Sequence, residues 1–123
     1  MKIWSCSWKS SKKPGKQRKY RYNAPLHVRH KLMAAHLSKE LRKKYEKRSI
    51  PIRKGDKVKI MRGKFKNKTG EVEQVILDKY RVYIKDIRRE KVDGTKVRVP
   101  FHPSNLMITE LKTEDKKRLK VKK

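Results

Sequence analysis

The sequence lacks long apolar runs and has only one cysteine, Cys6. No stretch approaches the roughly 18 consecutive apolar residues of a membrane-spanning helix. The first residues lack the apolar segment of a secretory signal. Cys6 has no partner for an internal disulfide, which is typical of a reducing compartment. Apolar residues make up 34% of the chain, below the usual share of about 45%. We therefore expect one domain at most, with a small core, in the cytoplasm.

Acidic residues are also scarce. The chain has 12 Asp and Glu against 39 Lys and Arg, so its net charge is +27 over 123 residues. The first acid is Glu40, and residues 112–123 hold seven cations. Self-repulsion on this scale disfavours a compact lone domain unless a polyanion neutralises it. The pattern predicts basic ends around a small mixed-charge domain, with nucleic-acid phosphate as the partner.

Catalytic and metal-binding patterns are missing as well. His27 and His30 could form half of a metal site with Cys6, but no second pair of ligands follows the zinc pattern. No Ser, His and acid arrangement indicates an activated nucleophile, and no phosphate-binding loop motif follows Gly63 or Gly70. We therefore expect no enzyme activity, metal, cofactor or small-molecule substrate. The histidines would contact phosphate, water or backbone.

Residues 1–23 are interpreted as a basic arm without regular structure. Trp4, Trp8, Tyr20 and Tyr22 interleave with cations, which suits stacking on unpaired bases and contact with phosphates. The alternative is a tail whose tryptophans dock on their own domain. Residues 1–19 and 116–123 contain too little apolar surface to fold alone. The candidate RNA-binding residues of the arm are Lys9, Lys12, Lys13, Lys16, Arg18, Lys19, Tyr20 and Arg21.

Residues 24–49 are predicted to be helical, with Arg29 and His30 as further candidate RNA contacts. Asn23 and Pro25 mark the start of a short helix. Residues 34–37 are interpreted as a break, and Ser38 as the N-cap of a second helix. Leu37, Leu41 and Tyr45 would form its apolar stripe.

Residues 50–111 alternate apolar and polar side chains, the period of half-buried strands. Strands are expected at 57–60, from 71, at 80–84, around 97–99 and at 106–108, with a turn at Asp93-Gly94. This number of short strands predicts a small, nearly closed barrel whose core holds Val58, Ile60, Val72, Val82, Ile84, Val97 and Val99. Pro100 and Pro103 would end their strand. Residues 112–123 form a basic tail in which Thr113 would cap a helical turn.

The loop at 61–70 holds four cations, one aromatic residue and no acid. Its glycines, Gly63 and Gly70, would supply positive φ angles. Together with Gly55-Asp56-x-Val58-x-Ile60 and Val72, the loop resembles the KOW motif, an RNA- and protein-binding module on an SH3-like barrel. Asn67 stands where many KOW sequences have glycine, and it tolerates left-handed geometry.

The flanking segments make the resemblance specific. Residues 22–29, 37–45, 48–54 and 102–105 are similar to the universal large-subunit ribosomal protein family L-twenty-four, called L-twenty-six in eukaryotes. A chain ending at Lys123 favours the archaeal form. The resemblance implies binding to large-subunit ribosomal RNA in its 5′ domain, early subunit assembly, a place near the polypeptide exit tunnel, and neighbouring ribosomal proteins as partners. The RNA contacts that it implies in the KOW segment are Lys57, Lys59, Arg62, Lys64, Lys66 and Lys68.

Two other functions fit part of the sequence. A KOW protein that regulates RNA polymerase would need a further domain ahead of the motif, for which residues 1–49 are short and basic. The positive charge would also suit a DNA-compacting protein, but that function would not explain the glycine and strand pattern at 55–72.

Overall fold

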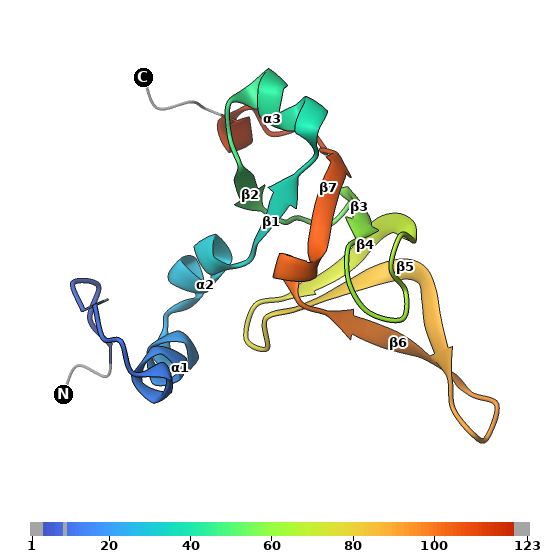
Figure 1. Cartoon of the computed structure of the whole chain (residues 1–123), viewed down its shortest axis with the longest axis horizontal. Coiled ribbons are helices and arrows are strands. Elements are labelled where there is room, and N and C mark those ends of the chain that lie inside the picture. The colour runs from blue at the N-terminus through green and yellow to red at the C-terminus, as the bar shows by residue number, and fades with distance from the viewer. Residues whose placement is uncertain (1–3, 9, 120–123) are drawn as a thin grey trace.

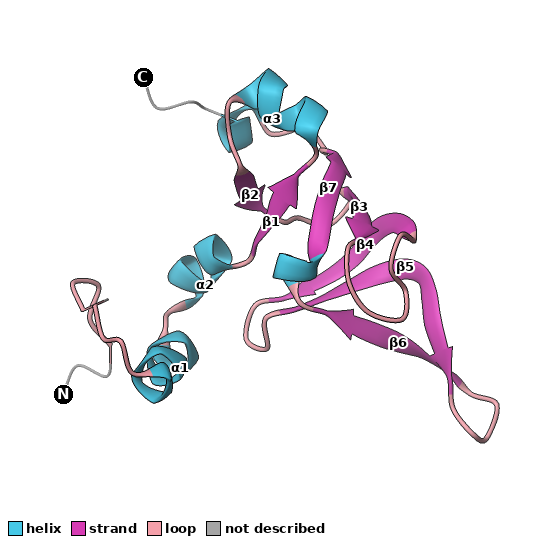
Figure 2. Cartoon of the chain, viewed as in Figure 1, coloured by secondary structure: helices cyan, strands magenta, loops and turns pink. Residues whose placement is uncertain are grey.

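A seven-stranded mixed sheet forms the centre of the molecule (Figures 1 and 2). The computed structural model describes residues 4–8 and 10–119. The strand order is β2-β1-β7-β3-β4-β5-β6, and most neighbours are antiparallel. The strands are β1 (Ala34–Leu37), β2 (Ser49–Pro51), β3 (Lys57–Ile60), β4 (Thr69–Ile76), β5 (Arg81–Glu90), β6 (Lys96–Phe101) and β7 (Leu106–Glu110). The helices are α1 (Pro14–Asn23), α2 (Leu26–Leu32), α3 (Lys39–Tyr45) and the short 3₁₀ turns η1 (Pro103–Asn105) and η2 (Lys116–Leu119).

Strands β3 to β7 enclose the core, as expected for a small KOW-type SH3-like barrel. Five of the predicted core residues are buried, with at most 1% exposure: Val58, Ile60, Val72, Val82 and Ile84. Leu106 and Ile108 of β7 belong to the same core and have no exposed surface. Val97 and Val99 are only half-buried, and Val99 packs at the edge of the core.

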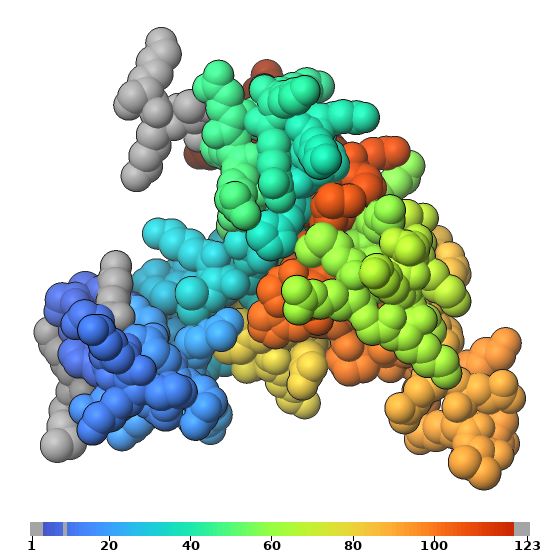
Figure 3. All heavy atoms as spheres, viewed as in Figure 1, coloured from blue at the N-terminus to red at the C-terminus, as the bar shows by residue number. Residues whose placement is uncertain are grey.

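The β5–β6 hairpin is longer than predicted. β5 continues past Ile84 to Glu90, with a register shift between Tyr83 and Arg88, where Asp86 takes φ 64°. Such an irregularity bends a strand without ending it. Pro100 does not end its strand either, since it lies within β6 opposite Tyr83. The turn at Asp93-Gly94 is confirmed, and this end of the hairpin projects from the barrel (Figure 3).

The predicted helical segment, residues 24–49, contains strand β1 and ends at the first residue of β2, so this prediction was wrong in part. Residues 34–37 form β1, which pairs with β2 on one side and runs parallel to β7 on the other. Ala35 and Leu37 are buried while Ala34 and His36 are half-buried, the alternation of a strand. β1 and β2 therefore extend the sheet beyond the barrel, as Figure 1 shows.

The cap of the second predicted helix is confirmed. The Ser38 hydroxyl accepts a hydrogen bond from the Leu41 amide at 3.4 Å, and α3 starts at the next residue. Glu46, in the left-handed region at φ 52°, ends the helix. Leu41 packs against the core, whereas Leu37 belongs to β1 and not to the helix.

The predicted basic arm contains a helix, α1, and this corrects the expectation of no regular structure. Tyr20 of α1 contacts both tryptophans, with ring centroids 5.1 Å from Trp4 and 6.0 Å from Trp8. The tryptophans thus dock within their own chain. They cover α1 with apolar surface that the helix sequence does not supply.

Arg29 of α2 fixes the helices to the barrel. Its Nε donates to the Ala24 carbonyl and its Nη1 to the Asp78 carbonyl, both at 2.8 Å. Its Nη2 donates to the Tyr22 carbonyl. Tyr80, in the turn directly before β5, donates a hydrogen bond from its hydroxyl to the Arg21 carbonyl at 2.7 Å. These contacts explain why α1 keeps a defined place beside the turn between β4 and β5.

The C-terminal segment is also anchored, contrary to the expectation for residues 116–119. The Arg118 guanidinium forms an ion pair with Asp56, whose exposure is 0%. Arg118 Nη1 donates to Asp56 Oδ1 at 2.7 Å, and Nη2 donates to the Pro51 carbonyl at 3.1 Å. Asp115, and not Thr113, caps the last turn by accepting from the Lys117 amide at 2.9 Å. Residues 120–123 of the predicted tail lie outside the described residues.

Candidate nucleic-acid interface

The loop between β3 and β4 presents exposed cations on a fixed backbone. The Asn67 amide donates to the Ile60 carbonyl at 2.8 Å, and the Lys66 amide donates to the Gly63 carbonyl at 3.1 Å. Gly63 has φ 95° and Asn67 has φ 69°, so asparagine does adopt left-handed geometry here. The side chains of the four loop cations are exposed: Arg62, Lys64, Lys66 and Lys68.

Phe65 anchors this loop to the barrel. Its ring meets the Phe101 ring edge-on at 6.0 Å, and the Lys68 ammonium lies 5.2 Å from the Phe65 centroid. Gly70 has a different role from the one expected, since its φ is not positive. A Cβ at Gly70 would lie 2.5 Å from Ile84 Cγ2, so the glycine permits close packing of β4 on β5.

Lys57 and Lys59 lie on β3, next to the loop, and differ in their surroundings. Lys57 is exposed, and its ammonium lies 2.8 Å from the Glu110 carboxylate. The hydrogen bond from Lys57 to Glu110 raises the pKa of Lys57 above its ordinary value. Lys59 is half-buried. Lys57 therefore has an acidic neighbour in the free protein, whereas the cations of the loop lie in a segment without acids.

The second basic surface is α1 with the residues just before it. The helix has four cations and no acid, and Lys12, Lys13, Lys16, Arg18, Lys19 and Arg21 are all exposed. Tyr20 is half-buried under the tryptophans. Lys9, also a candidate, lies outside the described residues.

Arg29 and His30 are less open than the other candidates. The Arg29 side chain is 12% exposed, and its guanidinium already serves three carbonyl groups and lies beside the Asp78 carboxylate at 3.6 Å. Arg29 therefore positions the basic helices in the free protein. His30 is half-buried.

A third basic group combines two predicted residues, Arg18 and Arg21, with residues that sequence reasoning missed. A hollow of about 330 Å³ lies where α1 meets the barrel. Arg18 and Arg21 come from α1, Lys79 from the β4–β5 turn, Arg81 from the start of β5, and His102 from the position before η1. Desolvation, followed by repulsion from Arg21 and Arg81, lowers the pKa of His102. No local pattern could indicate this group, because its members come from three separate segments.

Other site types find no support in the described part of the chain. Among residues 4–8 and 10–119, no three His, Cys, Asp or Glu side chains are grouped to hold a metal ion. The helices within those ranges are too short or too polar to span a membrane. What the surface does offer is positive charge on rigid elements, which suits a polyanion.

The fold and these surfaces define a small basic β-barrel protein with ordered flanking helices. A family model that describes the ribosomal proteins L-twenty-six of eukaryotes and L-twenty-four of archaea matches residues 11–122. A protein from Korarchaeum cryptofilum, "Large ribosomal subunit protein uL24", is 57% identical over 111 residues, which cover 89% of this chain and 85% of the relative. The chain belongs to this family of ribosomal proteins.

Membership confirms the family predicted from the sequence. The protein is a structural constituent of the large subunit of the cytoplasmic ribosome and is not an enzyme. The predicted KOW-type barrel is the body that holds the basic loop and α1.

Proposed function

We propose that this protein binds large-subunit ribosomal RNA in its 5′ domain and supports early subunit assembly near the polypeptide exit tunnel. The observation that supports this most strongly is the β3–β4 loop, whose cations are exposed and whose backbone is fixed at both ends. Cations at fixed spacing select one arrangement of phosphates, whereas cations on a free tail do not.

The surfaces around the loop extend the proposed interface. The cations of α1 would add further phosphate contacts. So would the hollow between α1 and the barrel, which is lined by Arg18, Arg21, Lys79, Arg81 and His102. The loop and this hollow come from separate elements that one core holds together. The protein would therefore bridge separate RNA segments and fix their relative position, a role that suits early assembly.

The proposal is tested by comparing two fourfold variants on two RNAs. The loop variant changes Arg62, Lys64, Lys66 and Lys68 to Ala. The control changes four other exposed lysines, Lys39, Lys43, Lys91 and Lys96, to Ala, with the same loss of charge. Each protein is titrated with a 5′-domain rRNA fragment and with a random duplex of equal length, over a range of salt concentrations.

We expect the loop variant to lose more affinity for the rRNA fragment than for the random duplex. Each lost phosphate contact should reduce the log–log salt slope by about 0.7–0.9. The control variant should lose affinity for both RNAs by similar factors. Equal losses for the loop variant on both RNAs would reduce the loop to a charge patch and favour non-specific binding. Failure to co-sediment with large subunits at moderate salt would contradict the proposed function itself.

A further inference from the structure

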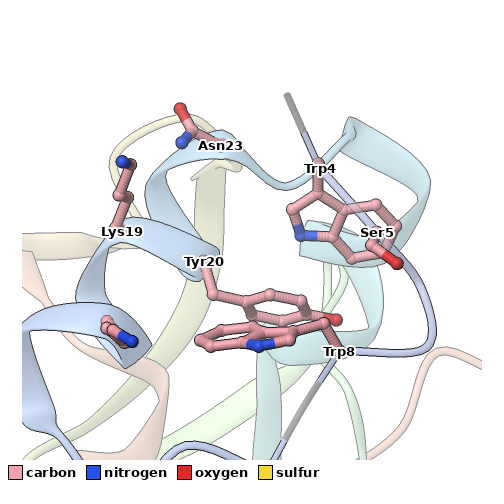
Figure 4. Close-up of a pocket in the computed structure, with 7 residues that line it drawn as sticks. Trp4, Ser5, Trp8, Lys19, Tyr20 and Asn23 are labelled. Atoms are coloured by element: carbon pink, nitrogen blue, oxygen red, sulfur yellow. The ribbon is translucent and has the colours of Figure 1, made fainter. Parts of the chain in front are cut away.

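An aromatic hollow of about 320 Å³ lies between residues 4–8 and α1 (Figure 4). Figure 4 shows the rings of Trp4, Trp8 and Tyr20 gathered beside the helix, with Lys19 and Asn23 extending from α1 nearby. Lys16 and Ser5 complete the lining, which contains no acid. The hollow is therefore aromatic on its walls and positive at its rim.

The rings are not packed face to face. Trp4 is inclined by 37° to Tyr20 and Trp8 by 41°. Trp8 is 40% exposed, so much of its indole remains accessible. The Trp4 Nε1 group is buried and has no hydrogen-bond partner among the described residues. A buried donor of this kind is costly unless an acceptor reaches it.

We propose that this hollow takes one unpaired RNA nucleotide, with its base stacked on Trp8 or Tyr20 and its phosphate beside Lys16 and Lys19. This deepens the proposed function, on which it rests. A base supplies a flat aromatic face, which can stack on the exposed part of the Trp8 indole. A phosphate supplies the charge that the two lysines complement.

Part of the site lies outside the segment that the family model matches. Trp4 and Trp8 precede residues 11–122, the segment matched by the family model. Only the α1 side of the hollow, with Lys16, Lys19 and Tyr20, falls within it. The tryptophan side of the proposed nucleotide site therefore lies outside the segment that the family model matches.

Tryptophan fluorescence of the full-length protein tests the proposal directly, because Trp4 and Trp8 are the only two tryptophans of the sequence. A labelled single-stranded oligouridine and a labelled duplex of equal length are titrated separately. Anisotropy of the label reports binding, and intrinsic tryptophan fluorescence reports whether the RNA contacts the hollow. We expect the single strand to quench tryptophan emission in step with anisotropy, and the duplex to bind with little quenching.

Two substitutions at Trp8 separate stacking from charge. Trp8→Ala should weaken binding of the single strand by about tenfold, the usual loss for one stacked base, and leave duplex binding within twofold. Trp8→Phe keeps a ring and should restore most of the affinity. The charge control is the double variant Lys16→Ala and Lys19→Ala, which should bind both the single strand and the duplex more weakly.

Each outcome of these titrations is decisive. Binding of the single strand without quenching, or equal losses on both RNAs for Trp8→Ala, would show that the tryptophans only cover α1 and would overturn the nucleotide site. The proposed rRNA function would survive that result. Absence of binding to rRNA fragments, oligouridine and duplex alike would defeat the proposed function together with this inference.

Discussion

The close approach of β4 to β5 depends on a single residue, Gly70. An added Cβ would lie 2.5 Å from Ile84 Cγ2 and 3.3 Å from the Lys85 carbonyl oxygen. Ile84 is 1% exposed, so its side chain has little room to move. We expect Gly70→Ala to lower the free energy of unfolding by about 1–3 kcal/mol, measured by urea denaturation.

Gly15 provides the matched control for this prediction. Its added Cβ would find Arg18 Nη2 at 3.9 Å and no closer atom, and it lies in α1. Gly15→Ala should leave stability unchanged or raise it by up to about 1 kcal/mol, because Ala loses less backbone entropy in a helix. Equal stability of the two variants would show that Gly70 is not tightly packed.

His102 makes the stability of the free protein depend on pH. Its pKa is lowered from 6.5, mainly by desolvation, and its Nδ1 accepts from the Ser104 amide at 3.2 Å. Near its ordinary pKa, the unfolded chain therefore binds a proton that the folded chain does not. Protonation favours unfolding, so the contribution of His102 to stability is present above pH 6.5 and is lost as the pH falls below it.

The measurement is the urea midpoint at about pH 7.5, 6.5 and 5.5, a range in which histidine is the main titrating side chain. His102→Asn keeps an acceptor near the position of Nδ1 and cannot gain the charge. This variant should lose less stability on acidification than the wild type. An unchanged pH profile would contradict the role given to His102.

At the scale of elements, one buried ion pair between Arg118 and Asp56 holds η2 and the segment before it against the barrel. Asp56 also accepts from the Arg53 amide and the Lys112 amide, both at 3.0 Å, so three chain segments meet at its carboxylate. Arg118→Met would leave this buried carboxylate without its charged partner. We expect a loss of about 3–5 kcal/mol in unfolding free energy.

Lys117→Met is the control, since Lys117 is exposed and adjacent in sequence. Amide exchange adds a local readout: the Arg53 amide should exchange faster in Arg118→Met and normally in Lys117→Met. Wild-type stability in Arg118→Met would mean that the C-terminal segment is not part of the folded unit.

The barrel was predictable from sequence because its signals are local. Val58 and Ile60 alternate with lysines, and Asp93-Gly94 marks its own turn. The α1 helix was not predictable, since the groups that hold it, such as Trp4 and Tyr80, come from other segments. β1 was missed because its parallel partner β7 lies far along the chain.

The candidate site divides in the same way. The loop cations could be named from a local pattern, four cations without an acid next to Gly63, and the structure shows their side chains exposed. Arg29 was predicted from charge alone, and only the fold reveals its three carbonyl partners. The His102 group needed three separate segments to be placed together.

At the scale of the whole molecule, charge repulsion opposes the fold. Ion pairs in the described residues engage acids at several places, including Asp78, Asp115, Glu73 and Glu110. With 12 acids for 39 cations, pairing cannot neutralise the surface. The core is small as well, so we expect the free protein to have little stability with which to offset the repulsion.

Salt and RNA should therefore both stabilise the protein. Raising potassium chloride from about 20 to 300 mM shortens the Debye length and screens surface repulsion, so the thermal midpoint should rise. A 5′-domain rRNA fragment at about 100 times its dissociation constant adds about 2.7 kcal/mol by mass action, a further shift on the order of 10 °C.

The variant with Arg62, Lys64, Lys66 and Lys68 changed to Ala has four fewer positive charges. It should respond less to both additions, because it has less repulsion to screen and fewer phosphate contacts to make. Differential scanning calorimetry of both proteins at each salt concentration provides the comparison. A midpoint that falls with added salt would mean that attractive surface ion pairs outweigh the repulsion, and that the excess charge does not limit the stability of this fold.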